Sequence, residues 1–140
     1  MFKTLRAMVT MLEHMLTGTM ESKKWDESAY AGIEGAPRLA VVDAVDLFHG
    51  DIEGEGTYRG VTVTALDGSG SFLSLIRLVG RVGGRAGSLV LRAEGTFDAS
   101  GSTATWTVVS GSGTGDLHGI EGGGGFESGE AGSTYTLDVS

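Results

Sequence analysis

The three histidines, His14, His49 and His118, are the side chains best suited to move protons near neutral pH. They stand far apart in the sequence and form no recognisable metal-binding motif, so we expect no metal site. His49 directly precedes a glycine at the expected end of a strand, which favours a solvated or turn-bonded side chain. His14 is the better candidate for a general base, because it lies near the expected mouth of the fold.

Two other patterns suggest chemistry only at first sight. The acidic turn Asp51-Ile52-Glu53-Gly54-Glu55 lacks the ligand spacing and the distal glutamate of a calcium loop. The glycine runs lack the lysine of a phosphate-binding loop and do not open a helix. The chain has no cysteine, which excludes disulfides and thiolate chemistry. We therefore expect no cofactor.

The aromatic residues are candidates for lining an apolar pocket, in which a tyrosine hydroxyl could orient a ligand. Trp106 is equally well explained as core, and Tyr135 as part of a closing strand. Tyr58 is the tyrosine that we favour as a site residue. The candidate catalytic residues are therefore Tyr58 and His14.

Composition limits the partners. The 140 residues carry a formal net charge of −8, which disfavours nucleic acid and anionic membranes. No apolar run approaches the roughly 20 residues needed to cross a bilayer, and the N-terminus is a poor signal peptide. We expect a cytoplasmic location and a single domain over residues 12–140. Residues 1–11 are open to two interpretations, a short amphipathic helix or a leader.

These residues must be positioned by strands. The glycine-rich segment 108–126 excludes a helix, because interior glycines destabilise helices and no helical periodicity is present. Three hairpins are expected in succession, with turns at Asp67-Gly68, at Gly83-Gly84 and within residues 99–102. The segment 133–139 can return to pair with the first strand and close a barrel. The sequence thus predicts an all-β fold, a closed antiparallel barrel of eight to nine strands.

Two of these strands have informative patterns. On residues 38–49, Leu39, Val41, Val45 and Leu47 alternate with polar partners such as Asp46, which predicts a long strand. On residues 72–79, both faces are apolar. Such a strand is expected to be covered on its outer side by another subunit or by the N-terminal segment. We therefore expect a homo-oligomer, in the first instance a dimer.

Several motifs resemble an uncharacterised bacterial family of small domains that have the allene oxide cyclase-like barrel fold. They include FHGDIEGEGT (48–57), DGSGSF (67–72), RVGGRAGS (81–88) and WTVVSGSGTGDL (106–117), and the resemblance covers about residues 14–139. It implies the eight-stranded barrel of allene oxide cyclases and dirigent proteins. It implies no agreed reaction for the family itself.

Departures from the family pattern suggest where a cavity lies. The resemblance implies a glutamate at Ile76 and a histidine at Ala93, and larger residues at the small positions of segment 60–64. A hairpin centred between Gly84 and Arg85 would set Ile76 opposite Ala93, and one centred on Gly68 would set Tyr58 opposite Leu78. The predicted pocket comprises Gly60, Thr62, Thr64, Phe72, Ser74, Ile76, Leu78, Leu91, Ala93 and Trp106.

Two functions follow from this interpretation. The first is a cofactor-independent cyclase or isomerase that holds a flexible hydrophobic molecule, lipid-like or polyketide-like, in an apolar cavity. The second is a ligand-binding or purely structural barrel without turnover. Fold alone does not decide between them.

Overall fold

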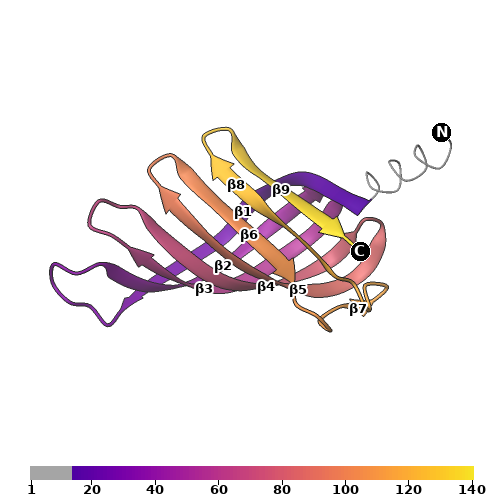
Figure 1. Ribbon diagram of the computed structural model, residues 1–140, viewed down its shortest axis with the longest axis horizontal. Coiled ribbons are helices and arrows are strands. Elements are labelled where there is room, and N and C mark those ends of the chain that lie inside the picture. Colours follow the sequence, from indigo (N-terminus) through magenta and orange to yellow (C-terminus); the bar gives the residue numbers. More distant parts are fainter. Residues whose placement is uncertain (1–13) are drawn as a thin grey trace.

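The computed structural model describes residues 14–140, and the regular structure over this range consists of nine strands (Figure 1). The predicted N-terminal helix or leader, residues 1–11, lies outside the described residues. The strands are β1 (Met15–Tyr30), β2 (Arg38–Gly50), β3 (Ile52–Thr64), β4 (Gly70–Val82), β5 (Arg85–Asp98), β6 (Gly101–Val108), β7 (Thr114–Gly115), β8 (Gly122–Gly129) and β9 (Gly132–Val139).

Eight of these strands form a closed antiparallel barrel. Around the barrel the order is β4, β3, β2, β1, β9, β8, β6 and β5, and β4 pairs with β5 to complete the circle. The last strand pairs with the first, as in the Leu16 and Leu137 pair. The two-residue strand β7 adds to the edge of β5. The prediction of a closed all-β barrel is therefore confirmed.

The glycine-rich segment closes one end of the barrel. After β6 the chain leaves the wall, forms β7 and returns as β8, and on the way Leu117 and Ile120 become completely buried or nearly so. A Cβ atom at Gly113 would overlap the Leu117 carbonyl, which explains a glycine there. The buried core gathers around this closure and comprises Leu16, Phe48, Ile52, Ile76, Leu78, Val82, Leu89, Leu91, Ala93, Trp106, Val108, Leu117, Ile120, Tyr135, Leu137 and Val139.

The other end of the barrel carries four hairpin connections, β1–β2, β3–β4, β5–β6 and β8–β9, which lie together at the left of Figure 1. The start of β1 and the C-terminus lie on the opposite side of that view. The barrel is therefore closed at one end by the glycine-rich crossing and bordered at the other by turns.

Both predicted hairpin registers are shifted by two residues. Ser74, and not Ile76, lies opposite Ala93, while Tyr58 lies opposite Ile76 and not Leu78. The β4–β5 turn consists only of Gly83 and Gly84, both with positive φ, a geometry typical of the tightest hairpins. Because side chains alternate with a period of two, this shift leaves each one on the predicted face.

The predicted strand over residues 38–49 is β2, and the structure shows which of its faces lines the barrel. The even-numbered residues face inward, and Ala40, Val42, Ala44 and Phe48 are buried, while Leu39 and Val41 are only half-buried on the outside. Phe48 of this set packs against Trp106, with 6.1 Å between the ring centroids. Asp46 belongs to this inward set.

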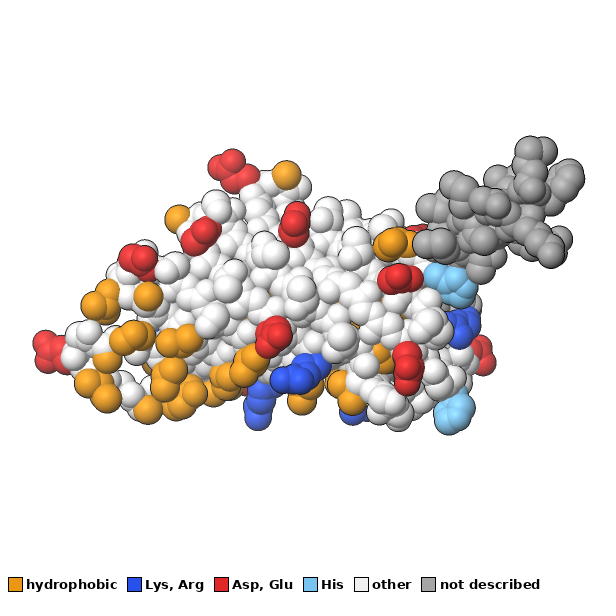
Figure 2. Space-filling view, viewed as in Figure 1, with side chains coloured by type: hydrophobic (Ala, Val, Ile, Leu, Met, Phe, Trp, Pro, Cys, Tyr) orange, Lys and Arg blue, Asp and Glu red, His pale blue; other side chains and the backbone are white. Residues whose placement is uncertain are grey.

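The outer face of β4 exposes three large apolar side chains to solvent within residues 14–140, with Arg77 between two of them. Leu73, Leu75 and Val79 are 50%, 56% and 55% exposed, and Val61 of β3 lies beside Leu73. Hydrophobic side chains gather along the lower left of the space-filling view (Figure 2). Within the described range, no helix is long and apolar enough to pass through a membrane.

Candidate functional site

A cavity of about 450 Å³ occupies the half of the barrel that is bordered by the hairpin turns. Its wall combines aromatic and aliphatic side chains with several hydroxyls and the carboxyl groups of Glu27 and Asp46. The lining residues are Met20, Glu21, Ser22, Trp25, Glu27, Val42, Asp46, Tyr58, Gly60, Thr62, Thr64, Phe72, Leu73, Ser74, Ile76, Phe97, Ser102, Phe126, Ser128 and Ser133.

A β-bulge in β1 directs two of these side chains toward the cavity. The pairing with β2 shifts between Ser22 and Lys24, so that Lys23 is an extra residue in the strand. Such an insertion reverses the alternation of faces along the strand. As a result Trp25 and Glu27, rather than their neighbours, line the cavity.

Asp46 supplies a carboxyl group to the cavity wall. It sits on β2 between inward-facing Ala44 and Phe48 and lies opposite Gly56 of β3, which has no side chain to cover it. Burial raises the pKa of Asp46 to about 6, and no hydrogen bond or neighbouring cation contributes to the shift. Asp46 can therefore take up and release a proton close to neutral pH.

Tyr58 stands on the neighbouring strand β3, near enough for the charge of Asp46 to affect it. Burial, and secondly the negative charge of Asp46, raise the pKa of Tyr58 well above its usual value. The phenol thus remains protonated at neutral pH and can donate a hydrogen bond. Its ring meets the edge of Trp25, with 6.3 Å between the ring centroids.

The remaining polar groups of the cavity differ in how they are satisfied. Arg38 Nη1 donates to Glu27 Oε1 over 2.7 Å, so the charge of Glu27 is balanced. The side chains of Ser128 and Ser133 hydrogen-bond to each other. The hydroxyl of Thr62 is buried and has no partner within residues 14–140. An unpaired buried hydroxyl costs about 1–3 kcal/mol, which makes Thr62 an additional candidate contact for a ligand.

A family model described as a protein of unknown function, DUF3224, matches residues 16–139. The chain belongs to the DUF3224 family. A crystal structure of a protein of unknown function from this family, from Shewanella oneidensis MR-1, is similar with a TM-score of 0.78. The two sequences are 24% identical, over 90% of this chain and 95% of that one. No curated protein matches.

These findings confirm the expected membership in an uncharacterised family. The DUF3224 match and the similar structure describe proteins of unknown function, so they carry a fold and no reaction. The similarity to allene oxide cyclases remains a prediction.

The structure divides the predicted pocket of this DUF3224 chain into two groups. Six residues line the cavity, namely Gly60, Thr62, Thr64, Phe72, Ser74 and Ile76. Four are packed into the core beneath it, namely Leu78, Leu91, Ala93 and Trp106. The predicted pocket thus extended too far toward the closed end of the barrel, where Trp106 and Phe48 fill the interior.

The two candidate catalytic residues also lie in different places. Tyr58 lines the cavity, whereas His14 is exposed just before β1 and does not contribute to the lining. Sequence reasoning missed Asp46, because both faces of β2 carry apolar residues and the alternation alone did not show which face lines the barrel. Phe48 and Ala44, two residues to either side of Asp46, carried the signal that would have found it.

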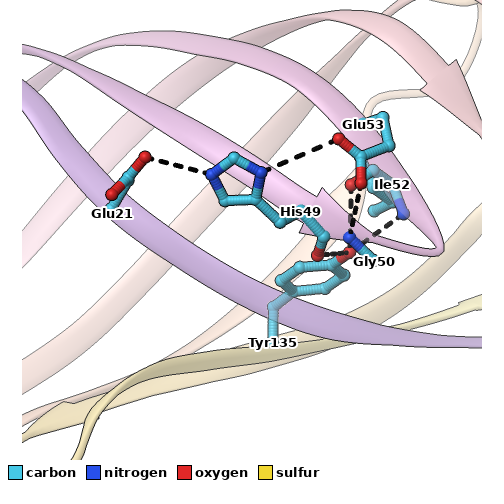
Figure 3. A network of polar contacts seen from close by, with 6 residues as sticks. All are labelled: Glu21, His49, Gly50, Ile52, Glu53 and Tyr135. Carbon is cyan, nitrogen blue, oxygen red and sulfur yellow. Dashed lines mark hydrogen bonds and ion pairs between the residues drawn. The ribbon is translucent and has the colours of Figure 1, made fainter.

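His49 and the acidic turn form a separate network at the closed half (Figure 3). The His49 ring lies between two carboxylates, with Nε2 at 3.1 Å from Glu21 Oε1 and Nδ1 at 3.7 Å from Glu53 Oε2. Beneath it, the Tyr135 hydroxyl donates to the His49 carbonyl over 2.8 Å and accepts from the Ile52 amide over 2.9 Å. This network fixes the β2–β3 turn against β9.

Neither this network nor any other cluster in residues 14–140 brings together three side chains that could hold a metal ion. A wider depression of about 920 Å³ lies among the hairpin turns. It shares Phe97, Ser102 and Ser128 with the cavity, so the two adjoin.

Proposed function

We propose that this protein binds a small, largely apolar molecule in the barrel cavity and catalyses its isomerisation by proton transfer, without a cofactor. The observation that carries the proposal is the carboxyl group of Asp46. It stands in a cavity of about 450 Å³ that Tyr58 also lines, and burial raises its pKa to about 6. A general base is most effective when its pKa lies near the working pH.

The two side chains have complementary roles in this proposal. The Asp46 carboxylate removes a proton from a carbon next to a substrate carbonyl, and the C–H electron pair becomes the C=C bond of an enolate. Tyr58, which keeps its proton, donates a hydrogen bond to the enolate oxygen and stabilises its charge. In a substrate with a C=C bond between its β and γ carbons the enolate is a dienolate, so Asp46 returns the proton to the γ carbon and the C=C bond moves into conjugation with the carbonyl.

The apolar side chains make this chemistry plausible in energetic terms. Trp25, Phe72 and Phe126 line the cavity, and the rings of Phe72 and Phe126 stack at 6.2 Å. An apolar wall limits the water around the carboxylate and strengthens the electrostatic interaction with the substrate. It also favours a flexible hydrophobic molecule over a highly hydrated one.

The experiment follows the exchange of hydrogen for deuterium at the carbons next to the carbonyl of decanone, a neutral ketone, by NMR in deuterium oxide. The full-length protein should accelerate exchange, and Asp46→Asn should lose nearly all of the acceleration while it still binds the ketone. Asp43→Asn is the matched control, because Asp43 lies on the outer face of the same strand and pairs with Arg59. It should retain the wild-type rate.

Two outcomes would count against the proposal in different ways. Binding without any exchange, across a panel of neutral ketones, would contradict catalysis and favour the alternative of a ligand-binding barrel without turnover. No binding at all would contradict the proposal as a whole and leave a structural barrel.

A further inference from the structure

The carboxylates of the cavity wall have no cationic counterpart there. Glu27 and Asp46 contribute their carboxyl groups to the lining, and none of the described lining residues is a lysine, an arginine or a histidine. The third acidic lining residue, Glu21, is hydrogen-bonded to His49 at 3.1 Å, and Glu27 is paired with Arg38, both outside the lining. Asp46 is the one carboxylate of the three whose charge the described residues leave unbalanced.

We infer that the cavity selects its ligand by charge, admitting neutral and cationic apolar molecules and excluding carboxylates, and that Asp46 is the residue that sets this selectivity. The inference rests on the proposed function, because it concerns the same cavity, and it adds the class of ligand. An anionic head group would meet a like charge in an apolar surrounding, where repulsion is much stronger than in water. The net charge of −8 acts in the same direction over longer distances.

The aromatic residues add to the preference for positive charge. Trp25 and Tyr58 meet edge to face beside Asp46, and ring faces of this kind attract cations. Ligands that share a hydrocarbon chain should therefore bind in the order amine, then ketone, then carboxylate. A long-chain acid is thus an unsuitable substrate, although it would match the cavity in hydrophobicity.

A carboxylate also loses hydration when it enters any apolar cavity, so weak binding of an acid does not by itself implicate Asp46. The decisive comparison is between the wild type and Asp46→Asn, which keeps the shape of the side chain and removes its charge. This substitution should strengthen carboxylate binding by roughly tenfold or more, and weaken amine binding by a similar factor, while ketone binding changes little.

The experiment is a competition assay with decylamine, decanone and decanoate, in which each displaces the uncharged fluorescent probe N-phenylnaphthylamine from the full-length protein at neutral pH. Asp43→Asn is the matched control, since it removes the same charge from the same strand, but on the outer face next to Arg59. It should leave all three affinities within about twofold of the wild type, because the pair it breaks is exposed.

The outcomes separate this inference from the proposed function. If the probe and all three competitors fail to bind, both are overturned. If decanoate binds as tightly as decanone, the cavity is a binding site but does not select by charge. If decanoate is excluded equally by wild type and Asp46→Asn, or if Asp43→Asn relaxes the exclusion as much, then Asp46 is not the selecting residue and the inference falls.

Discussion

Among single residues, Asp46 is expected to lower the stability of the fold while it supplies a carboxyl group that titrates near neutral pH. Its carboxyl group is half-buried, and its pKa is raised to about 6 by burial alone. Protonation is therefore easier in the folded than in the unfolded chain, where an aspartate has a pKa of about 3.9. Groups of this type are commonly found at functional sites.

The first prediction follows from this pKa shift. Between about pH 4 and pH 6 the folded protein binds more protons at Asp46 than the unfolded chain, so this residue lowers the free energy of unfolding as the pH rises through that window. Asp46→Asn should consequently be more stable than the wild type by roughly 1–2 kcal/mol at pH 7.5, after allowance for solvent screening. The gain should vanish near pH 4.

Urea unfolding of both proteins at the two pH values measures this difference. Asp43→Asn serves as the control, because the hydrogen bond from Arg59 holds the pKa of Asp43 below its usual value. That variant should show no stabilisation at pH 7.5. An Asp46→Asn protein that is less stable than the wild type at pH 7.5 would contradict the assignment of Asp46 as an uncompensated carboxylate.

Tyr135 is a single residue that stabilises the fold through its hydroxyl group. Its hydroxyl satisfies the buried Ile52 amide and the His49 carbonyl, and Gly18 provides the space that it needs, because a Cβ there would overlap the hydroxyl. Tyr135→Phe should therefore lower the free energy of unfolding by about 1–3 kcal/mol. Tyr30→Phe, on an exposed residue, should change it by less than about 0.5 kcal/mol. Equal effects of both substitutions in denaturant titrations would contradict this role.

At the scale of elements, β8 is a glycine strand because a neighbouring side chain crosses it. Trp106 on β6 lies opposite Gly124, and its indole Nε1 donates to the Thr136 carbonyl on β9 over 3.0 Å. A Cβ at Gly124 would overlap that carbonyl oxygen. The glycine run therefore permits close contact between strands, in addition to the corner that precedes it.

Alanine substitutions in this run should differ sharply between neighbours. Gly124→Ala should cost at least about 2 kcal/mol of stability, since backbone atoms must move. Gly123→Ala should cost less than about 1 kcal/mol, because its nearest neighbour would be the Trp106 carbonyl at 3.3 Å. Thermal unfolding compares the two directly. If Gly123→Ala is as destabilising as Gly124→Ala, close approach at Gly124 is not the reason for the glycine.

The strands also show which features of the structure could be predicted from sequence patterns. The alternation in β3, β4 and β5 and their glycine turns predicted these strands and their inward faces, and a shift of two residues in both registers left those faces unchanged. The β-bulge at Lys23 could not be predicted from the sequence. No local pattern marks the extra residue, because it is defined only by the pairing with β2, which is more than twenty residues away. It is this bulge that places Trp25 and Glu27 in the cavity wall.

At the scale of the whole molecule, the outer face of β3 and β4 bears on the expected dimer. On the adjacent strand β5, Glu94 lies beside Leu73 and Arg92 lies beside Leu75. The face therefore combines apolar side chains with charged side chains of both signs. Such a face can meet a second copy of itself about a two-fold axis, with opposite charges paired. We propose that two copies associate through it.

Light scattering of the eluting protein should give the mass of a dimer, and Leu75→Glu should shift it to a monomer. Leu66→Glu is the control, because Leu66 is also exposed, at 77%, but lies in the β3–β4 turn away from this face. A monomeric wild type across micromolar concentrations would contradict the dimer. A dimer that survives Leu75→Glu would mean that the copies meet elsewhere.

The barrel as a whole followed from the glycine pattern, the hairpins and the family resemblance, but the position of its cavity did not. The predicted pocket included Leu91 and Ala93, which pack with Trp106 in the core. Side chains from strands distant in the sequence determine which half of the barrel interior is filled. Their packing depends on the strand registers and on the crossing segment, which contributes Leu117 and Ile120 to the core.

We propose that the half of the barrel around Asp46 binds a small neutral apolar molecule. Amide NMR spectra of the full-length protein, recorded during titration with decanone, would reveal this binding. Saturable shifts are expected at cavity residues such as Tyr58, Ser74 and Phe126. Shifts that do not saturate, or that are confined to the outer face around Leu75 and Val79, would contradict it.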